Sequence, residues 1–184
     1  YSTDNLLSRA VSLDAAAKAE IKGVQAVVLP PIPFGSQNPG QTELPLCIHM
    51  RVETQKAILY DVVNSLKRGG INKLLIMNGH GGNNFNGVVR DLAVDFPDFL
   101  IGSTDWYKVV DARSFFTEPG DHAGELETSM MLHYYPDYVK PQAAYGTGAT
   151  RQFAISGLNN RSFWLPRNWQ LVSEDTGIGN PQHA

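Results

Sequence analysis

Apolar residues along this chain recur with two different periods, and each period predicts one kind of secondary structure. Helical spacing predicts four amphipathic helices, at residues 4–22, 53–67, 84–94 and 123–134. Short apolar runs bounded by turn residues predict three strands, at residues 25–29, 73–77 and 99–103. The first is expected to be buried and the second to be buried on both faces. Strands that alternate with helices indicate α/β units with a parallel sheet and right-handed connections.

The same spacing predicts where helices begin and which faces they bury. The first helix is expected to be capped by Thr3 or Asp4 and to end at Gly23, because glycine readily follows a last helical turn. Its expected inward side includes Leu13. In the second helix the expected inward positions are Ala57, Ile58, Val62 and Leu66.

After residue 136 the periodicity weakens, and glycine, asparagine and glutamine become frequent. We interpret this part as irregular structure packed onto the preceding elements. A chain of 184 residues is long enough for one domain with a real core and too short for two comfortable ones. We therefore expect a single α/β domain over residues 1–184.

Charge and cysteine content narrow the function classes. A net charge of −3 argues against nucleic acid or an anionic membrane as the main partner, since both favour a basic face. No apolar run reaches the roughly 18 residues that a membrane span needs. The single cysteine, Cys47, excludes an internal disulfide framework and a cysteine-rich zinc module. These features indicate a small-molecule partner and a cytoplasmic location.

The first cluster of polar residues directly follows the predicted strand at 73–77, where α/β sheets bind ligands. It reads NGHGGNN from Asn78 to Asn84. The glycines allow a sharp turn and close approach to a ligand, and His80 can face the crevice. An ordinary tight turn with a surface histidine is the alternative. A phosphate cradle is also open, although no lysine follows, so the segment is not a P-loop.

The second cluster opens the last predicted helix and reads DHAGELETS, residues 121–129. Glu125 in the first turn is adequately explained by the helix dipole. Glu127 is less easily explained if its neighbours are core residues, because a buried carboxylate needs a partner such as a metal ion or another cation. Trp106, after the third predicted strand, either lines a pocket or belongs to the core.

These residues together resemble the creatininase (creatinine amidohydrolase) family. The resemblance is carried by NGHGGN at 78–83, by DHAGELETS at 121–129, by Ser2-Thr3-Asp4 and by the late turn at 177–181. It implies a three-layer α/β/α fold with a mostly parallel central sheet. It also implies a metal-dependent hydrolase acting on carbon–nitrogen bonds other than peptide bonds, assembled as a homo-oligomer, often a hexamer.

The resemblance implies two divalent ions per subunit, zinc, manganese or iron. Asp4 would bridge them, His80 would bind one ion, and Glu127 would be the acidic ligand. His122 would act as a proton carrier or oxyanion stabiliser beside the reacting carbon, and Glu127 would also be catalytic. Asn78 would orient His80 from behind. The substrate-binding residues would be Trp106, Asn83 and Gly81.

The chain also departs from the family pattern. Gly82 stands where creatininase itself has an acidic residue, so creatinine is not the expected substrate; a cyclic amide or formamide-type bond is. The loop at 35–47 differs as well. Two further ligands, a glutamate and a histidine, would precede Tyr1, so we expect an internal portion of a longer protein, incomplete at both ends. The rival hypotheses are a non-catalytic protein binding a phosphate ester and a decayed homologue.

Overall fold

The computed structural model describes residues 2–160 and 162–184, and they group into two compact units. Unit 1 lies within residues 1–37 and 48–109, and unit 2 within residues 38–47 and 110–184. The expectation of one domain over the whole chain stays a prediction. In the described part, no helix combines the length and apolar character that crossing a bilayer requires.

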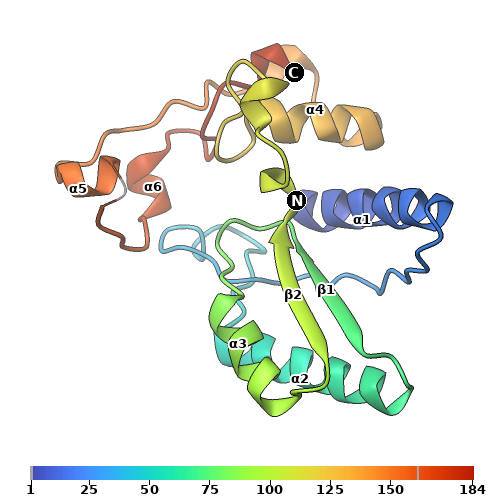
Figure 1. Cartoon of the computed structure of the whole chain (residues 1–184). Helices are drawn as coiled ribbons and strands as arrows, with labels where there is room; N and C mark the ends of the chain where they lie inside the picture. Colours follow the sequence, from blue (N-terminus) through green and yellow to red (C-terminus); the bar gives the residue numbers. More distant parts are fainter. Residues whose placement is uncertain (1, 161) are drawn as a thin grey trace. The chain divides into compact units, whose positions relative to one another are not determined.

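Unit 1 is built on two parallel strands. Its elements are α1 (Thr3–Ile21), α2 (Val52–Arg68), β1 (Lys73–Asn78), α3 (Asn86–Asp95), β2 (Leu100–Asp105) and the short 3-10 helix η1 (Trp106–Lys108). The strands pair in register from Lys73 with Leu100 to Asn78 with Asp105, and Figure 1 shows α2 and α3 beside them. The carboxyl ends of both strands therefore meet at one edge, as α/β units require.

The core of unit 1 lies where α2 and α3 pack on one face of this sheet. It consists of six buried side chains, Leu59, Val63, Val88, Leu92, Phe96 and Phe99. Burying such a side chain fully is worth about 1.5–3 kcal/mol. The opposite face is open in the described part, since Leu75 is 60% and Leu100 67% exposed. The expectation that the strand at 73–77 is buried on both faces is therefore wrong.

The strand expected at 25–29 is also wrong. This segment has no regular secondary structure, and Val27 is 85% exposed. A strand needs a neighbouring strand for its backbone hydrogen bonds, and nothing in the described residues pairs with these positions. The strand was predicted from apolar residues alone, and these do not specify a neighbouring strand for it to pair with.

Two helix expectations in unit 1 need correction. In α2 the buried apolar positions are Leu59 and Val63, one residue beyond the predicted face. Helix α1 begins after Ser2, so Thr3 and Asp4 lie inside its first turn and do not cap it. Its end at Gly23 is confirmed, with φ of 77°, a left-handed angle that glycine adopts without strain. Leu13, expected inward, is 45% exposed.

Unit 2 is mostly irregular, as predicted for the residues after 136. Its longest element is α4 (Glu125–Tyr134), followed by the four-residue helices α5 (Ser156–Asn159) and α6 (Trp169–Val172). Four 3-10 turns complete it: η2 (Ala112–Ser114), η3 (Pro136–Tyr138), η4 (Gln142–Ala144) and η5 (Pro181–His183). Helix α4 begins two residues later than predicted, because Gly124 is extended and Ala123 has φ of 50°.

Candidate active site

In unit 1 the backbone at His80 is fixed by Asn78, the last residue of β1. Asn78 is 4% exposed. Its Oδ1 accepts from the His80 N–H at 3.1 Å, and its Nδ2 donates to the His80 carbonyl at 3.0 Å and to Asp105 Oδ1 at 2.7 Å. The side chain thus ties the bend after β1 to the end of β2. This geometry supports the predicted role of Asn78 in orienting His80.

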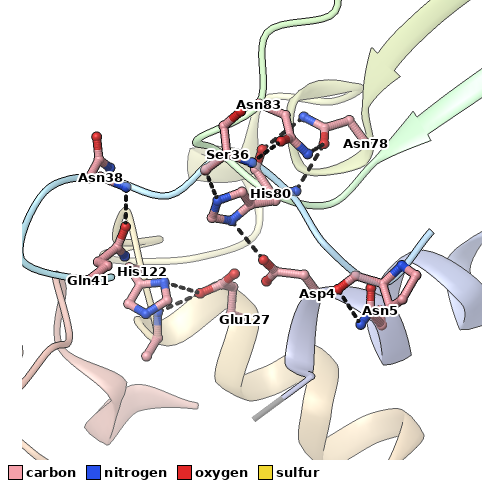
Figure 2. A network of polar contacts seen from close by, with 12 residues as sticks. Asp4, Asn5, Ser36, Asn38, Gln41, Asn78, His80, Asn83, His122 and Glu127 are labelled. Carbon is pink, nitrogen blue, oxygen red and sulfur yellow. Dashed lines mark hydrogen bonds and ion pairs between the residues drawn. The ribbon is translucent and has the colours of Figure 1, made fainter. Parts of the chain in front are cut away.

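The His80 ring lies between a carboxylate and a carbonyl (Figure 2). Nδ1 is 2.9 Å from Asp4 Oδ2, and Nε2 is 2.7 Å from the Ser36 carbonyl oxygen. A carbonyl oxygen only accepts, so Nε2 carries a hydrogen. In the neutral ring Nδ1 would then present a lone pair to a carboxylate oxygen. Either a second ring proton or a bound cation satisfies both atoms.

Glycines in the bend leave room for these contacts. A Cβ at Gly79 would collide with Ser8 Oγ and lie 3.0 Å from the Asp4 carbonyl, so α1 approaches because residue 79 has no side chain. A Cβ at Gly82 would meet the Ser36 carbonyl and lie 2.5 Å from His80 Nε2. The glycines thus act by permitting close packing around His80.

Asn83 links the Ser36 segment to Asn78 through its side-chain amide. Its Oδ1 accepts from the Ser36 N–H at 2.9 Å and from Gln55 Nε2 at 3.3 Å, and its Nδ2 donates to Asn78 Oδ1 at 3.1 Å. These bonds hold the Ser36 segment against the bend. The expected contact of Asn83 with substrate stays a prediction, and so does that of Gly81, an exposed residue near the Tyr107 hydroxyl.

Trp106 directly follows β2 and is 9% exposed, within unit 1. Its indole Nε1 is fully buried and has no hydrogen-bond partner among the described residues. An unsatisfied buried donor costs about 1–3 kcal/mol, which makes a bound acceptor favourable at this point. The predicted contact with substrate stays a prediction, and the unpartnered donor gives it a physical basis.

In unit 2 the start of α4 brings His122 and Glu127 together (Figure 2). His122 Nδ1 is 3.9 Å from Glu127 Oε2, which also accepts from the Ala123 N–H at 2.5 Å. Ala123 adopts its left-handed angle to make this bond, a conformation that costs a residue with a Cβ roughly 1 kcal/mol. The partner expected for the Glu127 carboxylate thus includes a backbone amide.

Glu125, which the helix dipole adequately explained, is the more buried carboxylate, at 6% exposed. It accepts from the Glu118 N–H at 2.7 Å and so fixes the segment that enters α4. Sequence spacing gave no sign of this role, because the donor is a backbone group.

Residues 175–178, which lead into the late turn at 177–181, hold the backbone of His122. Asp175 accepts from the Gly148 N–H and the Gly177 N–H, each at 3.1 Å, and these bonds, with that from Gly148 the largest cause, hold the pKa of its carboxyl below the ordinary 3.8. Ile178 exchanges backbone hydrogen bonds with His122, as N–H donor at 2.7 Å and as acceptor at 3.0 Å. The turn that resembles the family's late motif therefore anchors the backbone of a predicted catalytic residue.

Neither unit, in its described residues, contains a group of three or more histidine, cysteine or carboxylate side chains that could hold an ion. Each contains a pair instead: Asp4 with His80, and His122 with Glu127. The oxygen and imidazole donors suit zinc, manganese and iron. Binding of the same ions by Asp4, His80 and Glu127 stays a prediction.

Sequence reasoning missed three contributors to these pairs: the Ser36 carbonyl, Trp169 and Arg167. A backbone carbonyl has no sequence signal. Trp169 and Arg167 lie in the irregular part, and Trp169 contacts His122. The only available signal was an aromatic residue placed shortly before the late turn.

The family model described as creatinine amidohydrolase matches residues 1–184. The creatinine amidohydrolase of Pseudomonas putida is 27% identical over 146 residues, which is 68% of this chain and 56% of that protein. The chain thus matches little more than half the length of this curated relative.

The chain is also similar to solved structures of proteins named as creatinine amidohydrolase or creatininase. A Bacteroides fragilis protein assigned to the creatinine amidohydrolases has 49% identity and a TM-score of 0.94, over 99% of this chain and 72% of that one. A mutant creatininase complexed with creatine has a TM-score of 0.69 at 20% identity, over 100% of this chain and 75% of its own. A manganese creatininase has a TM-score of 0.59 at 21% identity, over 90% and 72% respectively. The last two are similar in fold alone.

Proposed function

Because the chain belongs to the creatininase family, we propose that it is part of a metal-dependent amidohydrolase that cleaves a carbon–nitrogen bond other than a peptide bond. Its expected α/β fold is confirmed. The observation that carries the proposal is the His80 ring, which donates from Nε2 to the Ser36 carbonyl and turns Nδ1 toward the Asp4 carboxylate. A metal-binding histidine typically donates its second nitrogen to such an oxygen.

Asp4 and His80 would hold a divalent ion from unit 1, with Glu127 as the acidic ligand from α4. Two ions, when bound, supply a water whose pKa is lowered toward roughly 7 and polarise the substrate carbonyl. Asp4 would serve both ions, because its carboxylate offers two oxygen donors. The Ala123 N–H holds the Glu127 carboxylate in one orientation. Zinc, manganese and iron all accept these ligands.

His122 would carry the proton of the reaction. An imidazole exchanges a proton readily near neutral pH and can protonate the leaving nitrogen as the carbon–nitrogen bond breaks. Its side chain is 40% exposed, so a substrate can reach it. Its backbone is held by Ile178, which limits movement during transfer.

Substrate recognition would use Trp106, Asn83 and Gly81. The buried Trp106 Nε1 is a donor for a substrate oxygen or nitrogen. An acidic side chain at residue 82, as the resemblance gives for creatininase itself, would meet the Ser36 carbonyl and the His80 ring. A cyclic amide or formamide-type substrate other than creatinine is therefore proposed. We also propose a homo-oligomer, six copies by resemblance, that works in the cytoplasm.

Metal content of the full-length protein, purified without chelator and measured by atomic emission, tests the proposal. Wild type should contain close to two divalent ions per subunit. His80→Ala and Glu127→Ala should each lose metal and hydrolysis of a panel of cyclic amides and formamides, because each removes a ligand. Arg151→Met, far along the chain from every ligand, should change neither. Unchanged metal in both ligand variants would refute the proposal, and phosphate-ester binding that survives them would favour the binding-protein alternative.

A further inference from the structure

The His122 ring lies edge-to-face with Trp169, a residue that the proposed mechanism does not use. The ring centroids are 5.3 Å apart and the planes meet at 89°. Trp169 is 5% exposed. Its Nε1 donates to the Thr176 carbonyl at 3.0 Å, and its backbone N–H donates to the Pro39 carbonyl at 2.8 Å. The indole is therefore a fixed surface against which His122 rests.

Arg167 holds the indole from a second side. Its guanidinium carbon lies 4.9 Å from the centre of the Trp169 ring, within the range of a cation–π interaction. Its Nη1 also lies 2.6 Å from Asp121 Oδ2, the carboxylate of the residue that precedes His122. We call Asp121, Arg167 and Trp169 the arginine clamp. The clamp joins the backbone beside His122 to the surface that its ring touches.

The backbone of His122 is fixed independently of the clamp. The Asp121 and His122 N–H groups both donate to the Ile178 carbonyl, and Ile178 donates back to the His122 carbonyl. What remains free is rotation of the imidazole about its side-chain bonds. The edge-to-face contact restricts the plane of the ring, and in the observed orientation Nδ1 lies 3.9 Å from Glu127 Oε2.

We propose that Trp169, held by Arg167, is a positioning residue that sets the orientation of the His122 imidazole. The inference rests on the proposed function for its kinetic consequence, since a proton carrier is effective only when its nitrogen is aimed at the reacting group. The orientation itself can be measured without turnover. Neither Trp169 nor Arg167 touches the substrate or the ions in this assignment.

Kinetics and histidine NMR of the full-length protein test this assignment. Arg167→Met should lower kcat between about threefold and thirtyfold with little change in KM, because orientation and not binding is lost. Trp169→Leu should do the same or more, and Trp169→Phe should restore most of the rate because a phenyl ring keeps the edge-to-face contact. Arg151→Met is the control, since Arg151 is another arginine paired with a carboxylate, Glu174 at 3.4 Å.

The second readout is the carbon-bound proton signals of His122 at one fixed pH, identified by their loss in His122→Gln. Trp169→Leu should move them, because the ring current of the indole is gone, and Arg167→Met should broaden or shift them. If the folded Arg167→Met protein keeps both the His122 signals and kcat of wild type, the inference is wrong while the amidohydrolase proposal stands. If wild type hydrolyses nothing but the signals move as described, the proposed function fails and the positioning role survives.

Discussion

At the scale of single residues, the unit 1 site depends on side chains that are missing as much as on those present. His80, Asp4 and the Ser36 carbonyl approach one another only because Gly79 and Gly82 carry no Cβ. A methyl group at either glycine would occupy the space in which these contacts form. Close packing around His80, a candidate metal ligand, therefore requires glycine in this bend.

Gly82→Ala tests that requirement. Its added Cβ would meet the Ser36 carbonyl and His80 Nε2, so the histidine must move. We expect metal affinity, measured by competition with a chromophoric chelator, to fall roughly tenfold to a hundredfold, as for other losses of support behind a ligand. Gly87→Ala is the control, because a Cβ there meets nothing within 4 Å. Gly87 lies in α3, where alanine should add up to about 1 kcal/mol of stability. Equal affinity in the two variants would contradict the packing argument.

Other residue-scale features could not be predicted. His80 and Glu127 were found from motifs, but the Ser36 carbonyl that accepts from His80 is a backbone group 44 positions away. Trp169 and Arg167 reach the His122 region across about the same separation, inside a stretch without periodicity. The spacing of residues along one element gives no information on contacts with distant parts of the chain.

At the scale of elements, the strength of the periodic signal decided how well the sequence predicted the structure. Helices α2, α3 and α4 and strands β1 and β2 all occur within two residues of their expected ends. The face of α2 was predicted one residue away from the buried one, because Ile58, Leu59, Val62 and Val63 are all apolar and two adjacent faces fit equally well. The segment at 25–29 failed because a strand depends on a partner that its own residues do not specify.

The α2–α3 layer should provide much of the stability of unit 1. Leu92 is 0% exposed at the centre of the core, so Leu92→Ala should lower the free energy of unfolding by about 2–5 kcal/mol, through lost burial and a cavity. Urea denaturation followed by circular dichroism measures this. Leu100→Ala removes the same atoms from a side chain that is 67% exposed, and it should cost less than half as much. Similar costs would mean that this layer is not the core.

The late turn should weaken in acid. Hydrogen bonds from Gly148 and Gly177 lower the pKa of Asp175 in the folded state, so its carboxylate stabilises the fold above the ordinary 3.8, and that contribution is lost as pH falls through the lowered value. Asp175→Asn should therefore melt below wild type at about pH 7 and approach it near pH 3. Asp98→Asn is the matched substitution, because it also replaces an exposed carboxylate, at the turn before β2. A constant difference for Asp175→Asn at both pH values would contradict this.

At the scale of the whole molecule, two units each contribute one pair of candidate groups. Unit 1 supplies a carboxylate and an imidazole from α1 and the bend after β1, and unit 2 supplies another such pair from the start of α4. The motifs and the resemblance named all four residues as candidates without indicating how they pair, and family membership over residues 1–184 was recognised from the same motifs.

The bond from His80 to the carbonyl of Ser36 has a consequence for how such proteins diverge. Every amino acid brings the same main-chain oxygen, so this bond to the histidine does not depend on which side chain residue 36 carries. The bond depends instead on the path of the loop. That path requires glycine at residue 35 and the side-chain oxygen of Asn83, which accepts from the Ser36 N–H. The side chains of the loop can therefore differ, and with them the molecules that the loop contacts, while the hydrogen bond to His80 is kept.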